Sequence, residues 1–124
     1  MYGGNGILGF ADKSNYTNCI AIGRVGAYCG SLYYEPQECW ISDNAISAQP
    51  KGDTDILYAY YLLSSLQLNE RHIGTGQPLL TQSILNGIKC KIPDSNTQNK
   101  IANLLGTLDA KRKINDEINK NLAA

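Results

Sequence analysis

Residues 97–122 read TQNKIANLLGTLDAKRKINDEINKNL, and this stretch separates a C-terminal helix from the rest of the chain. Seven positions recur at alternating intervals of three and four residues: Ile101, Leu104, Leu108, Lys111, Asn115, Ile118 and Leu122. This spacing predicts a narrow, mostly apolar stripe along one face of a helix. Because a lone helix cannot bury such a stripe, we expect it to pack on a partner helix or on the chain's own globular part.

Two polar residues, Lys111 and Asn115, interrupt the stripe and leave two interpretations open. In the first, the seam loosens there, or the register is off by one residue. In the second, the two residues fix the register or the orientation of a partner helix at some cost in stability, as polar seam residues can.

The start of the helix is marked by Pro93 and by Ser95 with Gln98, which fit a capping box. The sequence therefore predicts two parts, a body of residues 1–93 and a helix of residues 94–124. At 124 residues the chain has room for one modest hydrophobic core in addition to the helix.

Composition argues against several classes of protein. Basic and acidic residues number 11 each, so no overall positive field would hold the chain on nucleic acid without sequence preference. We expect no signal peptide, no membrane contact and a cytoplasmic location. Cys19, Cys29, Cys39 and Cys90 match no zinc spacing, so we expect buried thiols, with no metal and no cofactor.

A glycine-rich stretch opens the chain, and residues 4–9 match the pattern GxGxxG. A dinucleotide site needs a strand before this pattern and a helix after it. Neither fits here, because the three residues before the pattern are too few for a strand and a polar run follows it. We therefore expect a turn that brings the backbone close to another segment.

The body is expected to be mostly β. Residues 19–22 form an apolar run that predicts a buried strand, and further strands are predicted over 27–34 and 40–48. Arg24 lies on the turn after the first of these strands. It is placed to contact a phosphate or a guanine edge, or instead to pair with a carboxylate such as Asp43.

Helical spacing predicts a helix over residues 55–68, with Asp53 or Thr54 as its cap. A polar, glycine-rich loop over 71–78 either closes a turn or carries function. A short helix capped by Thr81 and a strand over 88–92 complete the body. The predicted fold class is α+β, with a mixed, mostly β body, one or two short helices and a long C-terminal helix of coiled-coil type.

Seven blocks in this order resemble the DNA-specificity subunit of type I restriction-modification systems. The resemblance covers nearly the whole chain and rests on YGGNGILGF, IAIGRVGAYCG, WISDNAI, YAYYLL, GTGQPLLT, a segment ending in IP, and a helix running through LDAKRKIN. The part resembled is the later portion of one target-recognition domain followed by the start of a spacer helix.

The resemblance implies a non-catalytic protein that reads one half of a split double-stranded DNA site. In this family two recognition domains sit at opposite ends of a pair of antiparallel helices, which set the gap between the half-sites. The modification subunits carry the methyltransferase and hold the helices, and the restriction subunit carries the nuclease. Self-association through the C-terminal helix is a further expectation.

The resemblance also directs the choice of site residues. The turn with Arg24 and the loop with Gln77 match blocks near the family's recognition surface, and Gln suits adenine as Arg suits guanine or phosphate. The candidate DNA contacts are Asn5, Lys13, Arg24, Tyr28, Arg71, Thr75 and Gln77. The candidate helix interface is the stripe of Ile101, Leu104, Leu108, Lys111, Asn115, Ile118 and Leu122.

Two other functions were weighed against DNA recognition. An assembly module would share the stripe but would make no direct contact with DNA. An enzyme is disfavoured, because His72 is the only histidine and no cofactor loop or cluster of acids accompanies it. Relative to the family, the chain is expected to lack the opening strands of the domain and to be a fragment, a truncated gene product or a half-subunit.

Overall fold

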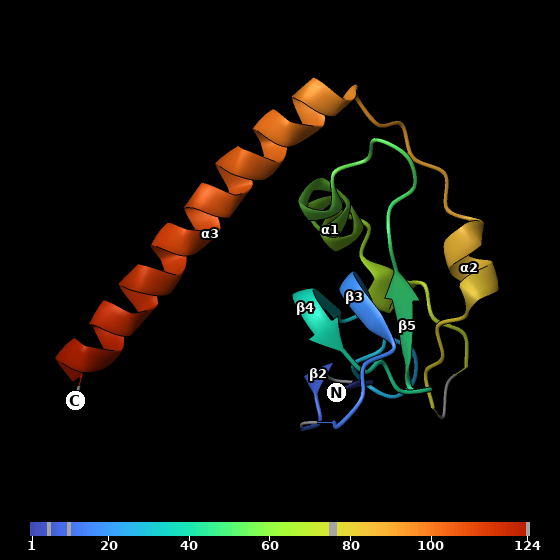
Figure 1. Cartoon of the computed structure of the whole chain (residues 1–124). Helices are drawn as coiled ribbons and strands as arrows, with labels where there is room; N and C mark the ends of the chain where they lie inside the picture. Colours follow the sequence, from blue (N-terminus) through green and yellow to red (C-terminus); the bar gives the residue numbers. More distant parts are fainter. Residues whose placement is uncertain (5, 10, 75–76, 124) are drawn as a thin grey trace.

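A three-stranded antiparallel sheet forms the centre of the body in the computed structural model, which describes residues 1–4, 6–9, 11–74 and 77–123 (Figure 1). The strands lie in the order β4-β3-β5, with β3 at Tyr16–Gly23, β4 at Leu32–Cys39 and β5 at Ala45–Ala48. A second, two-stranded sheet pairs β1 (Tyr2–Gly3) with β2 (Gly6–Ile7).

The central strand β3 is buried on both faces, which explains its unbroken apolar run. Because successive side chains of a strand point to opposite faces, Ile20 and Ile22 enter one core while Cys19 and Ala21 enter another. The first core also contains Cys29, Ile46, Leu68 and Leu80, and the second contains Tyr2, Cys39, Ile41 and Ala45. The strand predicted over residues 19–22 is therefore present and continues at both ends.

Helices cover the face of the sheet that Ile20 and Ile22 occupy. Helix α1 (Ile56–Ser65) packs there and is followed by the single 3-10 turn η1 (Leu68–Glu70) and by α2 (Gln82–Asn86). The cap of α1 is Asp55, whose Oδ1 accepts the Tyr58 N–H at 2.8 Å, and not Asp53 or Thr54 as expected. The predicted cap of α2 is confirmed, since Thr81 accepts the Ile84 N–H.

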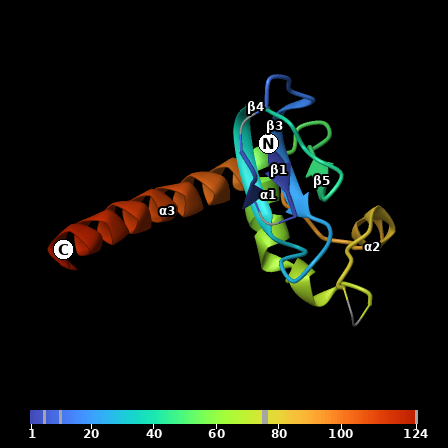
Figure 2. The ribbon, with the colours of Figure 1, turned by 90° about the horizontal axis from the view of Figure 1, so that it is seen from below.

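The long helix α3 (Ser95–Ala123) leaves the body and extends away from it (Figures 1 and 2). Its cap is Asp94, whose carboxylate accepts the Thr97 N–H at 3.2 Å, so the predicted capping box of Ser95 and Gln98 is wrong. The predicted fold class is confirmed: a mixed body, two short helices and a long C-terminal helix. The division at residues 93 and 94 stays a prediction.

Several predicted strand limits differ from the structure for identifiable reasons. The strand expected over 27–34 begins only at Leu32, because Gly30 adopts a φ of +87° in a turn packed on the backbone of Leu68 and Asn69. It then continues through Pro36, which an edge strand tolerates. The strand expected over 40–48 is limited to β5, and the strand expected over 88–92 is absent, since no secondary structure is assigned to those residues.

The N-terminal glycine-rich turn lies close to another backbone segment, as predicted, since a Cβ at Gly4 would lie 3.0 Å from the Val25 carbonyl oxygen. A side chain at Gly23 would collide with the carbonyl oxygens of Gly4 and Tyr28. Glycine at position 23 therefore lets the first hairpin pack against the turn that carries Arg24.

The cysteines only partly follow the prediction of buried thiols. All four are free; Cys19, Cys29 and Cys39 are buried, whereas Cys90 is exposed because the segment that carries it lies on the surface. The Sγ atoms of Cys19 and Cys39 lie 3.7 Å apart on neighbouring strands.

We expect Ile20→Ala to lower the free energy of unfolding by about 3 kcal/mol, because it opens a cavity beside a residue that is 1% exposed. Urea unfolding measures the change. The matched control is Ile7→Ala, at a side chain that is 69% exposed, and it should alter stability by less than about 0.5 kcal/mol. Equal effects of the two variants would contradict the burial of β3.

Candidate DNA and helix interfaces

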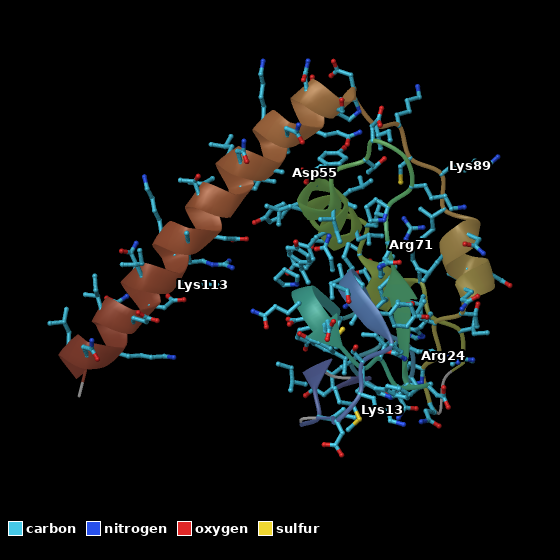
Figure 3. All side chains as sticks on the ribbon, viewed as in Figure 1. Lys13, Arg24, Asp55, Arg71, Lys89 and Lys113 are labelled. Carbon is cyan, nitrogen blue, oxygen red and sulfur yellow. The ribbon has the colours of Figure 1, made fainter. Side chains whose placement is uncertain are left out.

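The loops that carry Arg24 and Gln77 lie side by side although they are distant in the sequence. The Leu80 N–H donates to the Arg24 carbonyl at 2.8 Å, and the Gly26 N–H donates to the Pro78 carbonyl at 2.9 Å. Leu79 also exchanges two backbone hydrogen bonds of 2.9 Å with Ile73, which closes the second loop. Two separately predicted blocks therefore form one surface, on the side of the body away from α3 (Figures 1 and 3).

The Arg24 side chain is exposed at this surface. Its Nη1 lies 3.4 Å from the main-chain carbonyl oxygen of Asp43, at the outer limit of a hydrogen bond, and this contact is not to the carboxylate. The guanidinium is thus held weakly by the body and can form stronger hydrogen bonds with a ligand. Among the described residues no ion pair joins Arg24 to the Asp43 carboxylate, and contact of Arg24 with a ligand stays a prediction.

A polar cleft of about 240 Å³ lies beside Arg24. Of its other polar side chains, the sequence indicated only Asp43, as a possible partner of Arg24. It did not identify the rest, which are Asn15, Tyr16, Ser42, Ser47 and Gln82. The others come together through the path of the chain across the sheet, which the sequence pattern does not reveal.

Two further candidate residues, Tyr28 and Gln77, are exposed on the same two loops as Arg24. Tyr28 lies in the turn between β3 and β4, and Gln77 directly precedes Pro78. The candidates Asn5 and Thr75 lie outside the described residues. Loop exposure and the shared position are consistent with a contact surface that includes Arg24, Tyr28 and Gln77.

The remaining two candidates, Arg71 and Lys13, lie elsewhere. Arg71 donates from Nε to the Leu66 carbonyl at 2.9 Å and so satisfies the C-terminal end of α1 (Figure 3). Lys13 precedes β3, whereas Arg24 follows it. Lys13 lines a different cleft, of about 330 Å³, together with the acidic side chains of Asp12, Glu35 and Glu38.

Most of the helix stripe is uncovered by the body. Leu104 and Leu108 are 62% and 52% exposed, and every residue from 110 to 122 is exposed, including Lys111, Asn115, Ile118 and Leu122. Ile101, nearest the body, is half-buried. The stripe is therefore an apolar surface available to another helix.

A different face of α3 contacts the body. Ala102 is buried, Leu105 is partly buried, and the position of a Cβ on Gly106 lies 3.5 Å from Leu57 Cδ2 on α1. At 3.6 residues per turn, Ala102 and Leu105 lie roughly a third of a turn around the helix from Leu104 and Leu108. The helix thus presents one face to α1 and a separate face to solvent.

The contact of α1 with α3 includes a short hydrogen bond. The Tyr61 hydroxyl donates to Asp109 Oδ2 at 2.6 Å, and Asp109 Oδ1 lies 3.3 Å from Arg112 Nη2. Burial, followed by the Asp109 carboxylate, raises the pKa of Tyr61 to about 12. At the start of the helix, the hydrogen bond from Thr97 lowers the pKa of Asp94.

The part of the chain that the structure describes holds neither a candidate metal site nor a candidate membrane span. Over residues 1–4, 6–9, 11–74 and 77–123, no three His, Cys, Asp or Glu residues are grouped so as to hold a metal ion. Within the same ranges, no helix combines the length and the apolar character needed to span a bilayer.

These features define a small α+β body with a polar loop surface, joined to a helix that has one uncovered apolar face. The chain belongs to the family of type I restriction modification DNA specificity domains, whose family model matches residues 3–124. It is thus a DNA specificity domain of the type I restriction-modification class.

Two relatives agree with this assignment. The chain is 29% identical over 109 residues to the type I restriction enzyme EcoprrI specificity subunit of Escherichia coli, covering 87% of this chain and 27% of that protein. It also resembles the crystal structure of the type I restriction-modification S subunit of M. genitalium, with a TM-score of 0.72 and 27% identity over 87% of this chain. The chain spans less than a third of the length of either relative.

We expect Leu108→Asp to leave the stability of the isolated chain within about 0.5 kcal/mol of the original, because the side chain is exposed. Ala102→Asp should lower the free energy of unfolding by about 2 kcal/mol, because Ala102 is only 2% exposed and a carboxylate cannot remain buried there. Urea unfolding of the two variants at a concentration that keeps the chain monomeric tests both. If Leu108→Asp lowered the free energy of unfolding more than Ala102→Asp, the stripe, and not the Ala102 face, would pack on α1.

Proposed function

We propose that this chain reads one half of a bipartite double-stranded DNA site through the loops that carry Arg24, Tyr28 and Gln77. The single observation that supports this most is the backbone pairing of the two loops, which presents an arginine and a glutamine on one exposed surface. These two side chains carry the donors and acceptors that discriminate guanine and adenine in the major groove. Membership of the DNA specificity family supports double-stranded DNA as the partner.

We further propose that α3 docks onto other helices through its stripe. An exposed row of Leu and Ile on a helix is stabilised by a second helix with the same spacing, in the manner of a coiled coil. The occupants proposed are the modification subunits and a second specificity helix, which a second copy of this chain would provide. Lys111 and Asn115 would then fix the register of the pair.

In this proposal the chain recognises DNA, and the modification and restriction subunits supply the chemistry. The alternative is an assembly module that uses the stripe but has no contact with DNA. The exposed stripe fits both functions equally well. The paired loops favour recognition, because assembly alone gives no reason for a weakly held arginine beside a polar cleft.

Arg24→Ala should lower sequence-specific DNA binding of the complex assembled with modification subunits, while assembly remains intact. The DNA is a duplex selected from random sequences by the unchanged complex. If Arg24 contacts a guanine edge, discrimination at one base pair should fall by about 1–3 kcal/mol, and Arg24→Lys should not restore it. If it contacts a phosphate, all sequences should weaken alike and Arg24→Lys should retain binding.

The matched control for Arg24 is Lys51→Ala, which removes an exposed cation from the loop between β5 and α1. It should leave both affinity and discrimination unchanged. Unchanged binding by Arg24→Ala in the same assay would remove Arg24 from the contact surface and favour the assembly module.

Leu108→Asp should abolish both self-association and co-purification with modification subunits, because a carboxylate in an apolar helix seam is not solvated. Light scattering over a concentration series measures the mass of the chain. Asn103→Asp is the control, since it places the same group at an exposed position of α3 off the stripe. A Leu108→Asp protein that assembles normally would refute docking through the stripe.

A further inference from the structure

Hydrogen bonds connect α1 and α3 at two separate points. The first is Gln98, which is 3% exposed. Its Oε1 accepts the Asp55 N–H at 3.1 Å, and its Nε2 donates to the Pro93 carbonyl at 2.9 Å. Since Asp55 also caps α1, this single glutamine ties the first turn of α3 to the first turn of α1.

The second point is the hydrogen bond of 2.6 Å between Tyr61 and Asp109. It lies eleven residues farther along α3 than Gln98, or about 16 Å. Between the two points, Ala102 is buried and Gly106 faces Leu57 of α1, which a Cβ at this position would meet at ordinary van der Waals distance. With one hydrogen-bonded contact, α3 could rotate about that point. Two such contacts with packed side chains between them fix the angle between α3 and α1.

Beyond Asp109 the direction of α3 depends on this junction, because all residues from 110 to 122 are exposed. The segment from Asp109 to Leu122 measures about 20 Å. A change of about 10° in the angle at the junction would move its far end by about 3.5 Å. Successive base pairs of DNA are about 3.4 Å apart. A change of this size in the angle therefore moves the far end of α3 by about one base-pair step.

We infer that Tyr61 and Asp109 are positioning residues, whose hydrogen bond fixes the angle between the recognition body and α3 and so sets the spacing of half-sites that the assembly accepts. The part about spacing rests on the proposed function, because it requires a second recognition body at the other end of the helices. The part about the angle rests on this chain alone.

The angle is tested first on the isolated chain. Spin labels replace Lys13 and Lys113, which lie on the body and on α3 (Figure 3), in a chain with Cys90→Ser so that the remaining cysteines are buried. Tyr61→Phe and Asp109→Ala should both shift or widen the distribution of distances between the labels. Asp109→Asn keeps an oxygen that accepts from the Tyr61 hydroxyl and should restore the narrow distribution.

The matched control is Tyr34→Phe, which also removes one tyrosine hydrogen bond, that of 3.0 Å to Asn18, but at a site on β4. It should leave the distribution unchanged. If Tyr61→Phe and Asp109→Ala also leave it unchanged, the inference is overturned, because packing alone then fixes the angle.

The spacing is tested on the complex assembled with modification subunits, using duplexes whose half-sites are one base pair closer or farther apart than in the preferred site. Tyr61→Phe should reduce the preference for the original spacing by about tenfold, the effect of one hydrogen bond, without loss of affinity for a single half-site. If the Tyr61→Phe complex keeps its preference for the original half-site spacing although the distances between the spin labels widen, the role in spacing is refuted. Absence of specific binding by the unaltered complex would instead refute the proposed function and leave the result on the angle standing.

Discussion

Burial of β3 on both faces is the constraint on which the rest of the body depends. Four consecutive apolar residues cannot all be covered by one layer, because adjacent side chains point in opposite directions. One core forms with α1, η1 and α2, and a second forms with the N-terminal hairpin and the segment that crosses from β4 to β5. The turn after Gly23 continues from this doubly covered strand and places Arg24 beside the loop that contains Pro78.

The helix α3 satisfies two different requirements with two different faces. Near its start, small and partly buried residues pack on α1, and two hydrogen bonds hold it there. The stripe lies on another side and is exposed from Leu104 to Leu122. This separation allows the body to orient the helix without occupying the surface that a partner helix would need.

The candidate site could be predicted only in part. The two blocks with Arg24 and Gln77 were identified from composition and resemblance, because arginine and glutamine on glycine-rich loops carry a chemical signal. Lys13 and Arg71 have the same kind of side chain, yet one lies among carboxylates and the other caps α1. Their surroundings depend on which distant segments pack nearby, and local patterns in a single sequence do not predict that packing.

By itself the sequence determined the elements that depend on local periodicity: the apolar strand at residues 19–22, the helix capped by Thr81 and the spacing of the stripe. Only the tertiary structure decided the contacts between distant segments. Gln98 was expected to cap its own helix but bonds to Asp55, because a buried amide must satisfy its donors and acceptor with whatever backbone packs against it. Tyr61 and Asp109 meet for the same reason, since helix spacing fixes which residues share a face but not which helix that face will touch.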